Sequence, residues 1–341
     1  MRLNKTVCVR LAAVISLVAI AVLAILAYRL SSPPDRVQLA VPSAEAARIS
    51  FLALGDQGTG FLKQRKVARS MEKVAERMGD LDFVILLGDN FYNNGVQSVH
   101  DRLWNWKFEN MYAGRALATL PFYSVLGNHD VRGNEEVQIQ YSREHAGSGR
   151  WQMPGHNYSR DFGTDHGHPL LRVVFLDSNH LTPENVAKLV RSVEDAFAPS
   201  TTPATWRVVV AHHPIRNAGH HGETAELLPT LLPVLKKCHV DLYLAAHDHD
   251  QQFIVRDGEP YYVISGGGGQ DLYDLSGREN GLLFGKSQYG FSGIAVDPSR
   301  MEMVFYDQDG KSAARYVVDR NCSQPASVCL QDAPSGSKHK N

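Results

Sequence analysis

The chain has 341 residues, a hydrophobic content of 43% and a formal net charge of −1. This length and composition are typical of a globular protein with one large domain or two small ones. The near-neutral charge gives no electrostatic reason to expect a nucleic acid as a partner.

An apolar stretch near the N-terminus predicts export. Residues 11–27 are apolar except for Ser16, and as a helix they would span roughly 25 Å, near the lower limit for crossing a bilayer. The N-terminus should stay cytoplasmic, because basic residues precede the stretch: Arg2, Lys5 and Arg10. We predict a single-pass signal-anchor over residues 1–28, with the catalytic domain luminal or extracellular. A cleaved signal peptide and secretion are the alternative.

The rest of the chain divides into three parts. Residues 29–47 contain proline and small residues without periodicity, which predicts a linker. Residues 48–320 should form the globular domain. Residues 321–341, rich in Ser, Lys and Gly, predict a disordered tail.

Two features of the chain depend on the compartment. Cys322 and Cys329 flank a short loop and could form a disulfide in an oxidising compartment, or remain free thiols. The sequons at Asn157 and Asn321 could be glycosylated if the domain is exported, which would make the protein a glycoprotein.

Short aliphatic runs alternate with helical patterns through the first part of the domain. The predicted strands are Ile49–Leu54, Phe83–Leu87, Phe122–Leu126, Leu171–Leu176, Arg207–Ala211 and Val240–Ala245. The predicted helices are Phe61–Met78, Val96–Tyr112, Pro183–Phe197, with Thr182 as its cap, and Ala225–Lys237. This alternation predicts a largely parallel α/β sheet.

After His249 the pattern changes to strand-like runs joined by tight turns. These runs are Gln252–Val255, Tyr261–Ser265, Ser292–Val296, Met301–Tyr306 and Ala313–Val318. We expect an antiparallel arrangement that could form a second sheet packed against the first. The four glycines Gly266–Gly269 predict a flexible loop near the site, and a phosphate-binding nest is the alternative.

Metal-binding types of side chain directly follow several apolar runs. Strand ends on a rigid sheet are where ligands from distant parts of a chain can converge. Carboxylates, an amide and imidazoles together suit Fe, Zn or Mn, and one bridging carboxylate could hold two ions. The donors of this set are Asp56, Asp89, Asn128, His212, His247 and His249.

These segments resemble the five ordered motifs of the purple acid phosphatases, which are calcineurin-like metallophosphoesterases. The similarity extends from about Ile49 to Val318, and the short length is most like the tartrate-resistant acid phosphatase type. The motifs are Gly55-Asp56-Gln57-Gly58, Gly88-Asp89-Asn90-Phe91-Tyr92, Gly127-Asn128-His129-Asp130, Val209-Val210-Ala211-His212 and Ala246-His247-Asp248-His249. The resemblance implies an α/β fold, a four-layer α/β/β/α sandwich of two mixed sheets.

The resemblance also implies a ligand set for Fe(III) and a divalent ion (Fe, Zn or Mn). Asp89 would bridge the two ions. The ferric ion would be held by Asp56, Tyr92 and His249, and the divalent ion by Asn128, His212 and His247.

Tyr92 distinguishes this family within the superfamily. Many relatives carry Asp-x-His in the first motif, but here Gly58 stands at the histidine position, so one ligand is missing. The phenolate of Tyr92 can supply it, and a phenolate favours Fe(III). By resemblance, His129 and His221 would face the substrate, where an imidazolium can bind phosphate and protonate the leaving oxygen.

The resemblance therefore implies an acid phosphatase. A metal-bound hydroxide would attack phosphate monoesters, with small phosphate esters or phosphoproteins as substrates. A nucleotide phosphohydrolase or phosphodiesterase on the same fold is the alternative, and a binding module with an idle metal site is a third hypothesis.

The sequence departs from the tartrate-resistant acid phosphatase type at two places. His220 stands where that type carries an acidic residue. The segment between Leu176 and Trp206 is shorter than in that type, which makes proteolytic activation doubtful.

Overall fold

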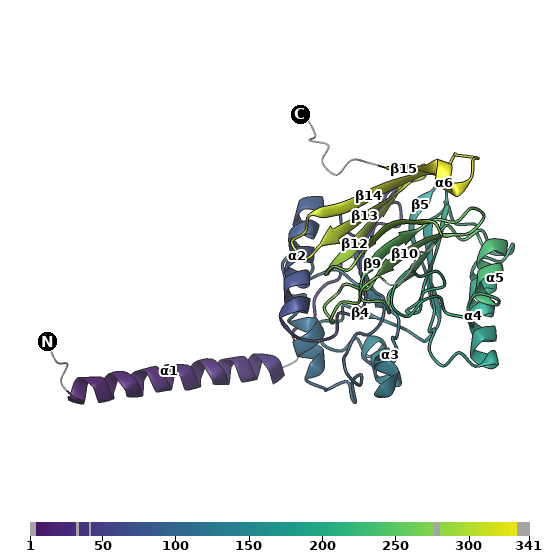
Figure 1. The fold of residues 1–341 in the computed structure, drawn as a ribbon. Coiled ribbons are helices and arrows are strands. Elements are labelled where there is room, and N and C mark those ends of the chain that lie inside the picture. The colour runs from purple at the N-terminus through teal and green to yellow at the C-terminus, as the bar shows by residue number, and fades with distance from the viewer. Residues whose placement is uncertain (1–4, 32–33, 41, 276–279, 333–341) are drawn as a thin grey trace.

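Two β-sheets packed face to face form the centre of the molecule. The computed structural model describes residues 5–31, 34–40, 42–275 and 280–332. Helices cover the outer face of each sheet, as Figure 1 shows. This arrangement confirms the predicted four-layer α/β/β/α sandwich.

The first sheet contains strands from both ends of the domain. Its members are β1 (Ile49–Leu54), β2 (Phe83–Leu86), β3 (Phe122–Ser124), β4 (Trp151–Gln152), β12 (Gly290–Val296), β13 (Arg300–Asp307), β14 (Ser312–Asp319) and β15 (Leu330–Asp332). Their spatial order is β15-β14-β13-β12-β1-β2-β3-β4. Strands β1 to β4 are parallel, and β12 pairs antiparallel with β1 through Ile49 opposite Val296.

The second sheet is built in the same mixed way. Its members are β5 (Tyr158–Asp165), β6 (His168–Phe175), β7 (Trp206–Val210), β8 (Leu242–Ala245), β9 (Gln251–Ile254), β10 (Tyr261–Ser265) and β11 (Leu282–Lys286). Their spatial order is β11-β9-β10-β8-β7-β6-β5. The four central strands pair in parallel, in the order β6, β7, β8 and β10. At one side β5 pairs antiparallel with β6, and at the other β9 pairs antiparallel with both β10 and β11.

Three apolar layers hold the sandwich together. Between the sheets, side chains such as Phe51, Phe83 and Val208 are completely buried. Helix α2 (Leu62–Met78) packs the apolar face predicted from its 3.6-residue period against the first sheet. Helices α4 (Pro183–Ala196) and α5 (Leu231–Lys237) cover the second sheet, on the side of the molecule opposite α2 in Figure 1.

The start of α4 confirms the cap predicted from sequence. The hydroxyl of Thr182 accepts a hydrogen bond from the Asn185 backbone N–H at 3.3 Å, and Pro183 occupies the first turn. Both features stabilise the start of the helix. The Thr182 hydroxyl accepts one of the N–H groups that have no partner within the helix, and Pro183 has no N–H group to leave unpaired.

Two predictions about the elements are wrong. The runs after His249 do not form a sheet of their own, since β9 to β11 join the second sheet and β12 to β15 join the first. The helix predicted over Val96–Tyr112 is reduced to a short helical segment around the π-helical turn η1 (Asn105–Glu109). The Asp101 carboxylate accepts hydrogen bonds from the backbone N–H groups of Gln97 and Leu103, which favours turns over a continuous helix.

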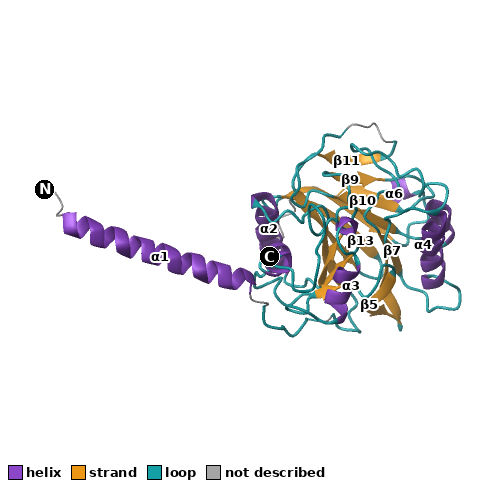
Figure 2. Cartoon of the chain, turned by 90° about the horizontal axis from the view of Figure 1, so that it is seen from below, coloured by secondary structure: helices purple, strands orange, loops and turns teal. Residues whose placement is uncertain are grey.

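The N-terminal helix lies outside the sandwich, and the segment after it runs along the surface of the domain. Helix α1 (Lys5–Ser31) projects away from the domain in Figures 1 and 2. Among the described residues, no helix reaches the length and hydropathy needed to cross a membrane. Helix α1 extends into the predicted linker, through residues 29–31. The described residues that follow, 34–40 and 42–47, contain no helix or strand, and they are tied to the domain by bonds from Val37 N to Ser148 O and from Ala40 N to Thr119 O.

The C-terminal prediction is partly wrong. Residues 321–332 are not a disordered tail, because they form α6 (Ala326–Cys329) and β15, whose strand pairs with β14. The remaining residues of that prediction, 333–341, lie outside the described residues. Cys322 and Cys329 form a disulfide with their Cα atoms 5.6 Å apart, which resolves the alternative left open by the sequence.

Candidate metal centre

Seven donor side chains converge at one edge of the two sheets. Each of them follows the carboxyl end of a parallel strand: β1, β2 and β3 in the first sheet, and β7 and β8 in the second. Five loops that are distant in sequence therefore meet at one point, as the position of the donor segments predicted. The donors are Asp56, Asp89, Tyr92, Asn128, His212, His247 and His249.

One group of donors surrounds the phenol of Tyr92. Its oxygen lies 3.2 Å from Oδ1 of Asp56 and 3.2 Å from Nε2 of His249. Nε2 of His249 is 3.7 Å from the same Asp56 oxygen. All three side chains are buried, so this group is a dry set of one phenol, one carboxylate and one imidazole.

A second group surrounds the amide oxygen of Asn128. Oδ1 of Asn128 is 3.1 Å from Nε2 of His212 and 3.1 Å from Nδ1 of His247. The two ring nitrogens are 3.3 Å apart. Two imidazole nitrogens and an amide oxygen at these distances match the ligand types of a borderline divalent cation.

Asp89 lies between the two groups. Its Oδ1 is 3.7 Å from Nε2 of His212, and ligand atoms of Asp56, Asp89 and His212 all lie within 4.8 Å of one another. The Oδ1 atom also accepts the backbone N–H of His129 at 2.8 Å. This position is the one that a carboxylate shared by two cations requires.

Backbone carbonyls fix which nitrogen of two histidines faces the site. Nδ1 of His212 donates to the Leu87 carbonyl at 2.9 Å, and Nδ1 of His249 donates to the Asp271 carbonyl at 2.6 Å. Each bond places the proton on Nδ1 and leaves the Nε2 lone pair directed at the other donors. Such outer hydrogen bonds are typical of metal-binding histidines.

The charge balance of the centre favours cations. Burial, and secondly the nearby Asp89, raise the pKa of Asp56 well above its ordinary value. Within the described residues, neither carboxylate forms an ion pair with Lys or Arg. Burial lowers the pKa of His212, and it lowers that of His249 to about 4, so both rings are neutral as metal binding requires. The donor set therefore fits metal ions.

The backbone of the donor loops is held in uncommon conformations. Asp56, Asp89 and His247 have φ angles of 57°, 53° and 71°, in the left-handed region that non-glycine residues seldom occupy. Residues in that region occur often at functional sites, where the surrounding structure imposes them.

Two histidines and a tyrosine lie next to the donors of the centre. His221 is exposed, its ring lies 4.2 Å from the His247 ring, and its Nδ1 is 3.1 Å from Oδ1 of Asp248. His129 is half-buried and its ring lies 4.4 Å from that of Tyr92. Tyr273, which the sequence did not single out, stacks on His249 at 4.2 Å with the two ring planes 11° apart.

Comparison with known proteins agrees with this geometry. The family described as Calcineurin-like phosphoesterase matches residues 49–251. Purple acid phosphatase 17 of Arabidopsis thaliana is 33% identical over 305 residues, which cover 82% of this chain and 87% of that protein. This chain belongs to the purple acid phosphatases. Tartrate-resistant acid phosphatase type 5 of Mus musculus is 30% identical over 308 residues, covering 82% and 92% of the two chains.

Solved structures share the purple acid phosphatase fold. GAP50, described as the anchor in the inner membrane complex of Plasmodium, aligns with a TM-score of 0.70 and 25% identity, over 79% of this chain and 87% of that one. The purple acid phosphatase PPD1 of yellow lupin aligns with a TM-score of 0.62 and 16% identity, over 82% of this chain and 55% of that one. The lupin enzyme supports the fold only, because its sequence is distant.

Gly58 in this purple acid phosphatase lies where a side chain has no room. A Cβ atom at Gly58 would lie 2.1 Å from the Asn90 carbonyl oxygen, so a histidine cannot replace it on this backbone. The glycines Gly266–Gly269 are buried as well, and Gly268 N–H bonds to Gly55 O at 3.1 Å. The prediction of a flexible glycine loop is therefore wrong, because these residues pack closely against the first motif.

Asp130 of the third motif is a supporting residue whose role the sequence did not reveal. Its buried carboxylate accepts the backbone N–H groups of Asn90, Phe91 and Gly127 at 2.9–3.0 Å. It also accepts the side-chain amide of Gln138 at 2.9 Å. Asp130 thus joins the loops that carry Asp89, Tyr92 and Asn128.

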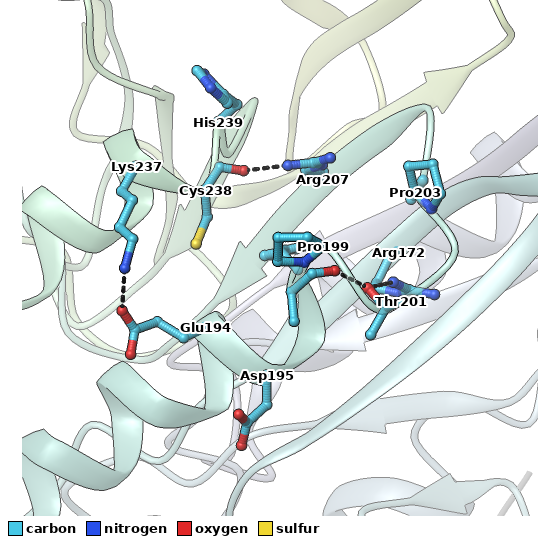
Figure 3. Close-up of a pocket in the computed structure, with 13 residues that line it drawn as sticks. Arg172, Glu194, Asp195, Pro199, Thr201, Pro203, Arg207, Lys237, Cys238 and His239 are labelled. Atoms are coloured by element: carbon cyan, nitrogen blue, oxygen red, sulfur yellow. Dashed lines mark hydrogen bonds and ion pairs between the residues drawn. The ribbon is translucent and has the colours of Figure 1, made fainter.

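A cavity of about 590 Å³ in this purple acid phosphatase is separate from the metal centre. It lies at the opposite edge of the second sheet, near the start of β7 and the end of α5 (Figure 3). Its cations are already bonded: Lys237 to Glu194 at 2.8 Å, Arg172 to Asp161 at 2.6 Å, and Arg207 to the Cys238 carbonyl at 2.6 Å. The cavity therefore adds nothing to the phosphatase site.

Proposed function

We propose that this protein is an acid phosphatase that hydrolyses phosphate monoesters with two metal ions held by the seven converging donors. The observation that carries the proposal is the phenol of Tyr92 within 3.2 Å of both Asp56 and His249, beside a second group around Asn128. Metal ions at these donors would lower the pKa of water and neutralise charge on the phosphate.

The half-buried His129 and the exposed His221 then act on the two sides of the phosphate. His129 is positioned by a bond from its Nδ1 to the Asn93 carbonyl at 2.8 Å, and its imidazole binds a phosphate oxygen. His221 is held at Nδ1 by Asp248, so its Nε2–H donates a proton to the leaving oxygen. The hydrogen bond that His221 donates to Asp248 raises the pKa of His221, which favours the protonated donor that this step requires.

We assign Fe(III) to the group with Tyr92, and Fe, Zn or Mn to the group with Asn128. The test is metal analysis of the purified protein together with its visible spectrum. We expect two metals per chain and a visible band that is lost in Tyr92→Phe, because the band requires a phenolate on ferric iron. A colourless protein that is fully active with two manganese ions would refute the ferric assignment and leave the phosphatase function standing.

Small phosphate esters and phosphoproteins are the proposed substrates, and a phosphodiesterase is the competing function. The two are separated by measuring kcat/KM for p-nitrophenyl phosphate and for bis(p-nitrophenyl) phosphate. We expect the monoester to be preferred. A clear preference for the diester would support the alternative, and full metal occupancy without turnover on either would support a binding module.

We further propose that α1 takes the domain out of the cytoplasm and attaches it to a membrane. The apolar side chains of α1 are exposed, including Leu11, Leu17 and Leu23 at 62%, 65% and 65%. The Cys322–Cys329 disulfide is also typical of an oxidising compartment. N-terminal sequencing of the mature protein distinguishes a retained helix from a cleaved signal peptide.

A further inference from the structure

A buried lysine lies behind the metal centre without any role in the proposed chemistry. Lys107, in the π-helical turn η1, is only 5% exposed. Among the described residues, the hydrogen-bond acceptor of its ammonium is the carbonyl oxygen of Tyr92. A buried ammonium without a carboxylate partner is unfavourable for folding, so a structural benefit alone does not account for it.

The carbonyl that Lys107 contacts lies between two functional side chains. The phenol of Tyr92 faces Asp56 and His249, each at 3.2 Å from its oxygen. The next carbonyl along the chain, that of Asn93, accepts the Nδ1 proton of His129 at 2.8 Å. The position of this short main-chain segment therefore determines where two side chains lie: the phenol of Tyr92, a proposed metal donor, and the imidazole of His129, a proposed substrate contact.

Lys107 is itself held in place by the first turn of α2, which follows the first motif in the chain. The side-chain amide of Gln64 donates to the Lys107 carbonyl at 2.9 Å. The Gln64 side-chain oxygen accepts the Gly60 backbone N–H at 2.7 Å. The loop that follows Asp56 is thereby connected through Gln64 and Lys107 to the loop that carries Tyr92.

We propose that Lys107 is a positioning residue that holds the Tyr92 main chain, so that the phenol meets Asp56 and His249 at the iron site. The proposal rests on the proposed function, since it takes Tyr92 to be a metal ligand. Lys107 touches neither substrate nor metal, and it acts only through Tyr92 and the adjacent Asn93 carbonyl.

The test compares Lys107→Met with wild type and with Lys66→Met in the full chain. Methionine has a similar length without the charge, and Lys66 lies on the solvent-facing side of α2 with its side chain 48% exposed. We expect the Lys107→Met protein to bind iron about 10-fold or more weakly against a competing chelator, and to show a shifted or weakened visible band. Metal-free Lys107→Met should unfold at the same or a higher urea concentration than wild type. Lys66→Met should match wild type in iron affinity and spectrum.

Lys107→Arg tests whether a cationic donor is what matters. It keeps the charge and the hydrogen-bond donors, and it should recover most of the iron affinity and the position of the band. The proposal is overturned if Lys107→Met binds iron with wild-type affinity and spectrum. It is also overturned if metal-free Lys107→Met is unfolded or much less stable, because the ammonium would then support the fold rather than the ligand. Wild-type protein that binds no iron would instead refute the assignment of Tyr92.

Discussion

Asp248 illustrates how a single residue can set the pH range of catalysis. It lies between two predicted metal ligands, yet its carboxylate bonds to Nδ1 of His221 at 3.1 Å and to the side-chain amide of Asn217. This hydrogen bond raises the pKa of His221, so the histidine proposed as the leaving-group donor would stay protonated to a higher pH. In the proposed mechanism, Asp248 is therefore a positioning residue that acts through His221.

Asp248→Asn should move the alkaline limb of the pH–rate profile to lower pH. The amide cannot stabilise the imidazolium, so the pKa of His221 falls and the donor loses its proton earlier as pH rises. We expect kcat for an alkyl phosphate to fall about 10-fold to 100-fold, and less for p-nitrophenyl phosphate, whose leaving group needs little protonation. Asp309→Asn, at a side chain that is 54% exposed, is the matched control. An unshifted alkaline limb would contradict the role of Asp248.

The sequence predicted which side chains converge at the site better than which residues support them. All seven donors converge as the motif order implied, because each follows a strand end whose position the fold determines. Asp130 was identified only as part of the third motif, without its supporting role, and Lys107 and Tyr273 were not identified. Their contacts join segments distant in the chain, and no local pattern marks a residue that acts on another loop.

At the scale of elements, α3 (Glu136–Arg143) is connected to the end of β6 through one histidine. His156 bonds to Asp177 through Nδ1 at 2.6 Å and to Glu136 through Nε2 at 2.8 Å. The hydrogen bond to Asp177, with that to Glu136, raises the pKa of His156 from 6.5 to about 9. A raised pKa means that protonation stabilises the folded state.

The stability of the protein should therefore depend on pH through His156. Its contribution is fully present below about pH 6.5 and is lost as pH rises through about 9. We expect the free energy of unfolding of the metal-free protein to decline over this range, and to decline less in His156→Gln. Urea unfolding at several pH values measures this, with His166→Gln as control because its side chain is 96% exposed. Equal declines in wild type and His156→Gln would contradict the prediction.

Strands were predicted well where burial made them uniformly apolar. β1 has the predicted bounds, and β2, β7 and β10 agree within about one residue, since all their residues lie in the core or at its edge. β5 was missed because most of its side chains are polar and only Phe162 is buried. The partition of the later strands between both sheets was also missed, because hydrophobic periodicity does not encode which strand a run pairs with.

At the scale of the molecule, α1 presents apolar side chains to solvent over the described part of its length. If α1 attaches the protein to lipid, full-length protein should sediment with phospholipid vesicles. Leu17→Asp should reduce this binding several-fold, because a buried carboxylate is costly in an apolar environment. Val328→Asp, at a side chain that is 62% exposed elsewhere on the surface, should have no effect. Equal binding by both variants would contradict the attachment, and kcat/KM on a soluble ester should stay unchanged.

The pairing of Ile49 with Val296 has a consequence for the time at which this protein can fold. β1 lies between β2 and β12, so the strand that leads into Asp56 stays incomplete until nearly the whole chain has left the ribosome. Contacts between such distant residues slow folding, and a nascent chain would remain in a state that a translocation channel can accept. Export before folding would also delay assembly of the seven donors, so the metals would be acquired in the destination compartment.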